Sequence, residues 1–126
     1  MREIKFRAWY EKEKRFLSWD ELQDGTESLQ TYFNNELSDV SPLMQYTGLK
    51  DKNGKEIYEG DILSTDLSRP YLIVCFRNGA FMVQCHDDGK DYYDLMVSID
   101  EESDQVEHLE VIGNIYENPE LLEESK

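Results

Sequence analysis

The sequence predicts an α+β chain that is predominantly β: an antiparallel meander closing into a small, partly open, SH3-like barrel, with an N-terminal hairpin and one helix. Short alternating apolar runs, the glycine-centred turns between them and a single stretch with helical apolar spacing indicate this class. At 126 residues the chain is expected to form one domain, 1–126. Within it we expect a hairpin and helix at 1–42, a barrel-like core at 43–117, and a helical turn with a tail at 118–126.

The first predicted element is a hairpin. Apolar residues alternate with other residues from Ile4 to Tyr10, which is the period of a half-buried strand. Residues 11–14 form the expected turn, and a short return strand with Phe16, Leu17 and Trp19 is expected to follow. The polar run 20–25 is then expected to turn the chain.

One helix is predicted, from Glu27 to Leu37. Apolar residues recur there at spacings of three and four, which places them on one helical face. Thr26 is the expected N-cap, and Pro42 lies beyond the predicted end.

The stretch 44–63 contains three glycine turns. Asn53-Gly54 predicts a type I′ hairpin turn that sets Lys52 opposite Lys55. Gly60 tolerates unusual backbone angles and Asp61 can bond its own turn, so the strand can re-enter there. The candidate structural turn residues of the chain are Gly48, Asn53, Gly54, Gly60, Asp61, Asn78 and Gly79.

The strongest hairpin signal is Asn78-Gly79 between two apolar runs, 71–77 and 80–86. A two-residue loop sets Phe76 opposite Phe81 and makes one face of the pair wholly apolar. The second face carries Ile73, Cys75, Met82 and Gln84. Because this face is too apolar for plain solvent surface, either barrel closure or a partner chain is expected to cover it.

The C-terminal part is expected to continue the meander. A turn at 87–90 leads into a strand at 92–99, an acidic turn at 100–105 and a last strand at 106–116. Asn118 is then expected to cap a closing helical turn that begins with Pro119.

Five stretches carry a family resemblance. They read IKFRAW (4–9), QYTGL (45–49), DKNG (51–54), IYEGDI (57–62) and VIGNIYENP (111–119). Together they resemble the YopX family of phage and prophage proteins. The resemblance implies a small, β-rich intracellular protein encoded by mobile elements. It implies no assigned activity and transfers no catalytic residues.

Charge is unevenly placed along the chain. The net charge is −15, yet the first fifteen residues carry +3 and the remainder −18. An acidic body repels phosphate backbones, so direct nucleic-acid binding is not expected, whereas a basic protein could bind. The N-terminus lacks an apolar signal region, and the longest uncharged apolar run, 71–76, is too short to span a bilayer. We therefore expect a cytoplasmic protein with no membrane partner.

The sequence predicts no catalytic residue, metal site or cofactor. Cys75 and Cys85 are expected on opposite faces of their hairpin, outside disulfide reach, and His86 and His108 are not grouped with further ligands. Phosphate-loop, hydrolase and dinucleotide motifs do not occur. A perturbed carboxylate pair stays open, because spacing alone cannot identify one among 28 acids.

Two functions follow as hypotheses. The first is a non-catalytic phage or prophage accessory protein that self-associates through an apolar surface. The candidate surface residues are Ile4, Phe6, Trp9, Tyr46, Ile73, Cys75 and Met82. The alternative is an acidic decoy whose carboxylates occupy the basic surface of a host nucleic-acid-binding protein. An enzyme on a β scaffold is the remaining class, and it would need a polar pocket.

Overall fold

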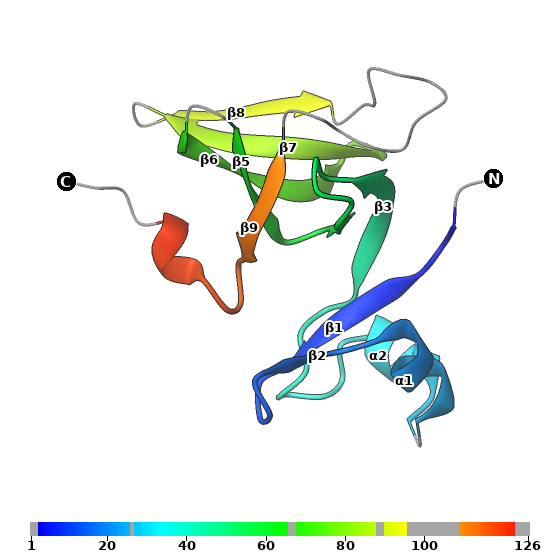
Figure 1. Ribbon diagram of the computed structural model, residues 1–126. Coiled ribbons are helices and arrows are strands. Elements are labelled where there is room, and N and C mark those ends of the chain that lie inside the picture. The colour runs from blue at the N-terminus through cyan, green and yellow to red at the C-terminus, as the bar shows by residue number, and fades with distance from the viewer. Residues whose placement is uncertain (1–2, 26, 66–67, 88–89, 96–108, 123–126) are drawn as a thin grey trace. The chain divides into compact units, whose positions relative to one another are not determined.

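The computed structural model describes residues 3–25, 27–65, 68–87, 90–95 and 109–122 (Figure 1). In chain order the elements are β1 (Phe6–Tyr10), β2 (Arg15–Leu17), α1 (Trp19–Asp24), α2 (Leu29–Phe33), β3 (Met44–Lys50), β4 (Glu56–Tyr58), β5 (Asp61–Thr65), β6 (Ser68–Arg77), β7 (Ala80–Asp87), β8 (Lys90–Leu95), β9 (Glu110–Asn114) and the 3₁₀ helix η1 (Pro119–Leu122).

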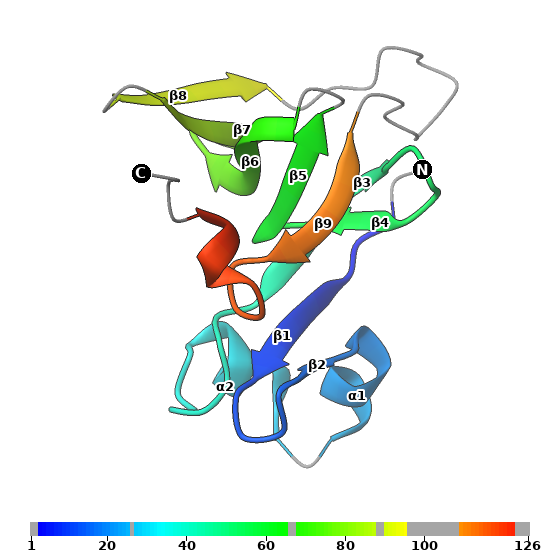
Figure 2. The same ribbon diagram turned by 60° about the vertical axis from the view of Figure 1, so that its left-hand side comes forward.

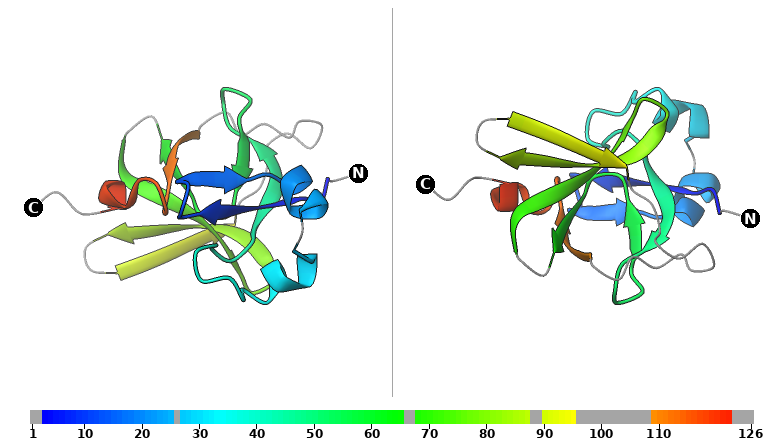
Figure 3. Two further views of the ribbon diagram at one scale, coloured as in Figure 1. Left: turned by 90° about the horizontal axis from the view of Figure 1, so that it is seen from below. Right: turned by 90° about the horizontal axis from the view of Figure 1, so that it is seen from above.

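The strands form two antiparallel sheets, of order β2-β1-β3-β4 and β8-β7-β6-β5-β9. The second sheet curls into a half-barrel, and in the described part of the chain many more residues lie in strands than in the two short α-helices, which confirms the predicted class. Figure 2 shows β5 beside β9, and both views of Figure 3 show β7 beside β8. The chain divides into two compact units, Met1–Tyr46 and Thr47–Lys126. That the whole chain folds as one domain stays a prediction.

The first unit is built on the predicted β1–β2 hairpin, in which Ala8 pairs with Leu17. Ala8 packs in a core cluster with Leu22, Tyr32 and Val40. Its neighbour Trp9, which points to the opposite face of the strand, is also buried. β1 is therefore covered on both faces in its middle, where alternation alone predicted one buried face.

Two short helices replace the one that was predicted. The expected turn at 20–25 is helix α1, and Trp19, which was expected in the return strand, is its first residue. The helix begins at a capping box: the Ser18 hydroxyl accepts from the Glu21 N–H, and the Glu21 carboxylate accepts from the Ser18 N–H. The predicted helix 27–37 is shorter, and its N-cap is Ser28 rather than Thr26, which lies outside the described residues. It ends at Asn34.

The main core cluster of the second unit is centred on Ile57, Leu63 and Val74. Ile62, on the opposite face of β5 from Leu63, is also fully buried. The β6–β7 hairpin has the predicted register, with Phe76 opposite Phe81. Asn78 and Gly79 have φ of 56° and 81°, as a type I′ turn requires.

The C-terminal predictions are tested in part. Strand β8 covers the beginning of the predicted strand 92–99, and residues 96–108, including the predicted acidic turn, lie outside the described part. Strand β9 lies within the predicted last strand, and η1 forms where a helical turn was expected. No helix in the described ranges is long and apolar enough to cross a membrane.

Candidate functional site

The turn between β3 and β4 is organised by the buried carboxylate of Asp51, which is 1% exposed. One oxygen accepts hydrogen bonds from the N–H groups of Asn53 and Lys55, at 2.9 and 2.8 Å. The other oxygen accepts from the N–H of Val111 at 2.9 Å. A buried carboxylate is stable in such a site because three backbone donors compensate its lost hydration.

This geometry shows that the predicted type I′ turn at Asn53-Gly54 is wrong. Gly54 has a positive φ of 82°, but Asn53 is not among the residues with positive φ in the described part of the chain. The Asp51 N–H donates to the Lys55 carbonyl at 2.8 Å, so Asp51, not Lys52, lies opposite Lys55. The loop thus has three residues and ends in a left-handed glycine.

A second polar position lies where β5 begins. Asp61 is 2% exposed, and its carboxylate accepts from the N–H of Tyr58 at 2.8 Å. Gly60, at φ 85°, donates its N–H to the Val74 carbonyl and accepts from the Ile115 N–H, both at 2.9 Å. Gly60 therefore ties the start of β5 to β6 and to the segment after β9.

The third polar position is Asn114, which pairs with Asp61 across β5 and β9. Its side-chain oxygen accepts from the N–H groups of Tyr116 and Glu117, at 3.0 and 2.9 Å. Its side-chain amide donates to the Glu117 carboxylate at 2.9 Å. These bonds fold the chain back immediately after β9.

The predicted surface residues separate into buried and exposed groups. In the first unit, Ile4 is 61% exposed and Phe6 is half-buried, whereas Trp9 and Tyr46 are each 3% exposed. The Trp9 indole N–H donates to Glu11 at 2.7 Å, and its ring packs on Phe16. Trp9 and Tyr46 therefore lie in the interior of their unit, which corrects their placement in the candidate surface.

In the second unit the predicted surface residues lie together. Register places Ile73, Cys75 and Met82 on one face of β6 and β7, and all three are half-buried. Tyr93 of β8 joins this face because it pairs with Gln84, the partner of Ile73. The guanidinium of Arg77 lies 4.2 Å from the centre of the Tyr93 ring.

Several exposed aromatic residues were not predicted as surface positions. Phe33, Phe76, Tyr92 and Tyr93 are 54%, 51%, 53% and 36% exposed. The adjacent pair Tyr92-Tyr93 was a usable signal, because neighbours in a strand point to opposite faces. One of the two therefore had to lie on the face opposite the cluster of Leu63 and Val74.

Comparison with known proteins gives the same family as the motifs. A family model described as YopX protein matches residues 5–123. The chain belongs to the YopX family. It is similar to protein EF1440 from Enterococcus faecalis, for which a crystal structure is known. The two chains share 30% sequence identity, and their structures match with a TM-score of 0.52 over 98% of this chain and 100% of that one. No curated protein matches the chain.

The stretches that carry the YopX resemblance contain the four buried polar residues of the described part, Thr47, Asp51, Asp61 and Asn114. Asp51, Asp61 and Asn114 all accept hydrogen bonds from backbone N–H groups of their own unit. Such bonds fix turns and strand ends. These stretches of the second unit therefore supply hydrogen bonds that hold its turns and strand ends.

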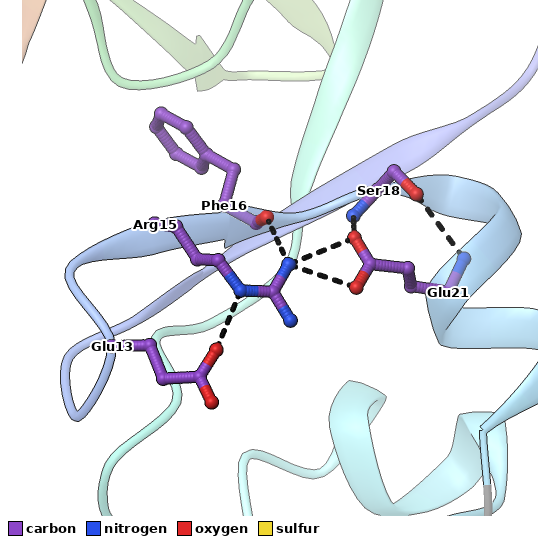
Figure 4. Close-up of polar contacts among 5 residues, drawn as sticks. All are labelled: Glu13, Arg15, Phe16, Ser18 and Glu21. Atoms are coloured by element: carbon purple, nitrogen blue, oxygen red, sulfur yellow. Dashed lines mark hydrogen bonds and ion pairs between the residues drawn. The ribbon is translucent and has the colours of Figure 1, made fainter.

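Figure 4 shows an exposed charged cluster of the first unit. Arg15 bonds Glu13 at 2.6 Å and Glu21 at 2.8 Å. Its guanidinium also donates to the Phe16 carbonyl at 3.3 Å. The backbone N–H of Ser18, and then Arg15, hold the pKa of Glu21 below its ordinary value, so the cluster stabilises the start of α1.

The two cysteines are free thiols. Cys75 pairs with Met82 and Cys85 with Leu72, which places the thiols on opposite faces of the hairpin. Burial raises the pKa of the Cys75 thiol. Within the described ranges, no three His, Cys, Asp or Glu side chains are grouped so that they could hold a metal ion.

Proposed function

We propose that this YopX-family chain is a non-catalytic protein-interaction module that self-associates, and that it serves a phage or prophage in the host cytoplasm. The observation that carries the proposal is that the outer strands of the second sheet, β6 to β8, present apolar side chains on both faces. Phe76 and Tyr92 are about half exposed on one face. Ile73, Cys75 and Met82 are half-buried on the other.

Exposed apolar area of this kind favours a binding surface. Soluble proteins keep large contiguous apolar patches for partners or ligands, since water is otherwise left against hydrocarbon. Because these side chains lie on opposite faces of β6 to β8, a single core cannot bury both sets. A partner chain would remove them from water.

We infer a non-catalytic role because buried polar side chains bond the protein's own backbone. The buried Asp51 and Asn114 are occupied by backbone hydrogen bonds. A general acid or base needs a carboxylate that can reach a substrate proton. The arrangement of Asp51 and Asn114 favours a structural role.

Light scattering coupled to size exclusion at micromolar protein and two ionic strengths tests self-association. We expect a mass above the 14.9 kDa of one chain, and a larger fraction of the oligomer at higher salt. Salt screens the repulsion between copies that each carry −15. A mass of 14.9 kDa under both conditions would contradict the proposal.

A second candidate function is the acidic decoy, and the charge of the chain favours it. The segment 87–124 contains fourteen acidic residues, with Lys90 as its single Lys or Arg. A decoy would bind the basic groove of a host nucleic-acid-binding protein by complementary charge. A pull-down from host lysate at rising salt separates the two: a decoy loses its partner, whereas self-association strengthens.

A further inference from the structure

We propose that β8 is the edge at which a second copy of this chain adds. In this arrangement two β8 strands pair antiparallel across a two-fold axis, with Tyr92 opposite Tyr92 of the second copy. The inference rests on the proposed self-association and assigns it a surface, a register and a set of residue pairs.

The two edges of the second sheet differ. At the β9 edge, the Leu109 carbonyl accepts from the Lys52 N–H and the Val111 N–H donates to Asp51, both at 2.9 Å. The turn between β3 and β4 therefore occupies that edge. At the other end of the strand order stands β8, and no further strand of the described part pairs with it.

The side chains of β8 fit an open edge that binds apolar rings. All five described side chains, residues 90–94, are exposed. Tyr92 and Tyr93 are 53% and 36% exposed. An edge strand offers N–H and carbonyl groups to another strand, and proteins usually blunt such an edge with charges or a proline. Lys90, Asp91 and Asp94 are charged. Pairing at β8 therefore requires a register in which these charges complement one another beside the tyrosines.

Charge selects the register. Lys90 and Asp94 lie two residues before and two residues after Tyr92. When two antiparallel copies meet at Tyr92, each Lys90 lies opposite an Asp94, which gives two opposite-charge pairs beside a tyrosine pair. Because strand side chains alternate, these pairs all lie on one face.

The neighbouring registers are less favourable. Setting Tyr92 opposite Tyr93 places Asp91 opposite Asp94 twice, and like charges directly opposite each other destabilise a strand pair. Centring on Tyr93 sets Tyr92 opposite Asp94 and leaves Lys90 without an opposite carboxylate. All these antiparallel registers are isologous, as a closed two-fold dimer requires, so the charge pairs decide among them.

A charge-swap series tests the pairs. Lys90→Glu alone and Asp94→Lys alone each set like charges opposite one another twice, so we expect each to weaken dimerisation about tenfold or more. The double variant Lys90→Glu/Asp94→Lys restores opposite charges and the original net charge, and should dimerise like the natural chain. Lys90 is also the register partner of Asp87 in its own hairpin, so Lys90→Glu should lower the unfolding midpoint slightly in both the single and the double variant. Unfolding curves of all three variants show that each is folded.

A disulfide trap tests the register independently. In a chain with Cys75→Ala and Cys85→Ala, the added Tyr92→Cys should form a crosslinked dimer under mild oxidation, since directly opposite residues lie within disulfide reach. Phe33→Cys in the same background is the control, because Phe33 is 54% exposed but lies far from β8 in the chain. Equal crosslinking of the two variants would overturn the register.

The outcomes separate this inference from the proposed function. A natural chain that is monomeric at both ionic strengths contradicts both. An oligomeric natural chain whose mass is unchanged by Lys90→Glu and by Asp94→Lys, with no Tyr92→Cys crosslink, keeps self-association and overturns β8 as its surface. Loss in both single variants with recovery in the double variant supports the pairing.

Discussion

The Asp51 carboxylate accepts a hydrogen bond from the N–H of Val111 at 2.9 Å, although 60 positions separate the two residues. The same side chain bonds two N–H groups within its own turn. One carboxylate therefore fixes both the shape of a local loop and the position of that loop on strand β9.

Replacing Asp51 should be among the most destabilising single changes in the second unit. Asp51→Ala leaves three backbone donors without their acceptor, so we expect the free energy of unfolding to fall by about 3 kcal/mol. Urea denaturation followed by circular dichroism measures it. Asp24→Ala removes an exposed carboxylate and is the control. Equal midpoints for the two variants would contradict the role of Asp51.

Gly113 is required because Asn118 approaches it closely. A Cβ built on Gly113 would lie 2.5 Å from the side-chain oxygen of Asn118 and 2.7 Å from its Cγ. Gly113→Ala should therefore cost about 1 to 3 kcal/mol of stability through overpacking.

A double-mutant cycle isolates this contact. Asn118→Gly removes the clashing atoms, so adding Gly113→Ala in that background should cost clearly less than in the natural chain. Thermal unfolding of the four proteins gives the coupling. If the two changes are additive, their close approach is not what selects glycine at Gly113.

Gly54 is selected for a different reason. Its φ is +82°, and no atom within 4 Å would meet an added Cβ. Gly54→Val should lower the melting temperature more than Lys55→Val, because a β-branched residue is strained at positive φ. Gly54→Asn should recover part of the loss, since asparagine tolerates the left-handed region. Equal melting temperatures for the two valine variants would remove the conformational explanation.

Glu21 supplies a prediction about pH. The Ser18 N–H and then Arg15 lower its pKa from the ordinary value of 4.5. A lowered pKa means that Glu21 contributes stability above its ordinary pKa and loses it as pH falls through the lowered one. Carbon-detected NMR titration of the natural chain should place Glu21 below 4.5. Arg15→Gln should move the pKa part of the way back, and no movement would exclude Arg15 as a cause.

The two Asn-Gly turns show how far the sequence could predict the fold. At Asn78-Gly79 both flanking strands alternate cleanly, and the register followed from the loop alone. At Asn53-Gly54 the same dipeptide lies one residue later in its loop, because the Asp51 side chain captures the N–H groups of Asn53 and Lys55. The same carboxylate accepts a hydrogen bond from the Val111 N–H, and a local sequence pattern cannot predict a contact between residues 60 positions apart.

The helices and the surface show the same limit. Ser18 and Glu21 form a capping box whose sequence signal was present, but the polar composition of 20–25 concealed it. Trp9 was expected at the surface because strand alternation assumes one buried face. Its exposure of 3% depends on Phe16, which belongs to the neighbouring strand. The predicted register correctly placed Ile73, Cys75 and Met82 on one face. The sequence could not show that all three are half-buried, which only the structure shows.

The turn that closes the β9 edge limits how large an assembly this sheet can build. A sheet that is open at both edges can add copies head to tail without end and grow into a fibre. Here the bonds from Lys52 and Asp51 take up groups of Leu109 and Val111, so growth at β9 is obstructed. A sheet that adds only at β8 stops at two copies. Weakening the Asp51 turn would then favour aggregation as well as unfolding.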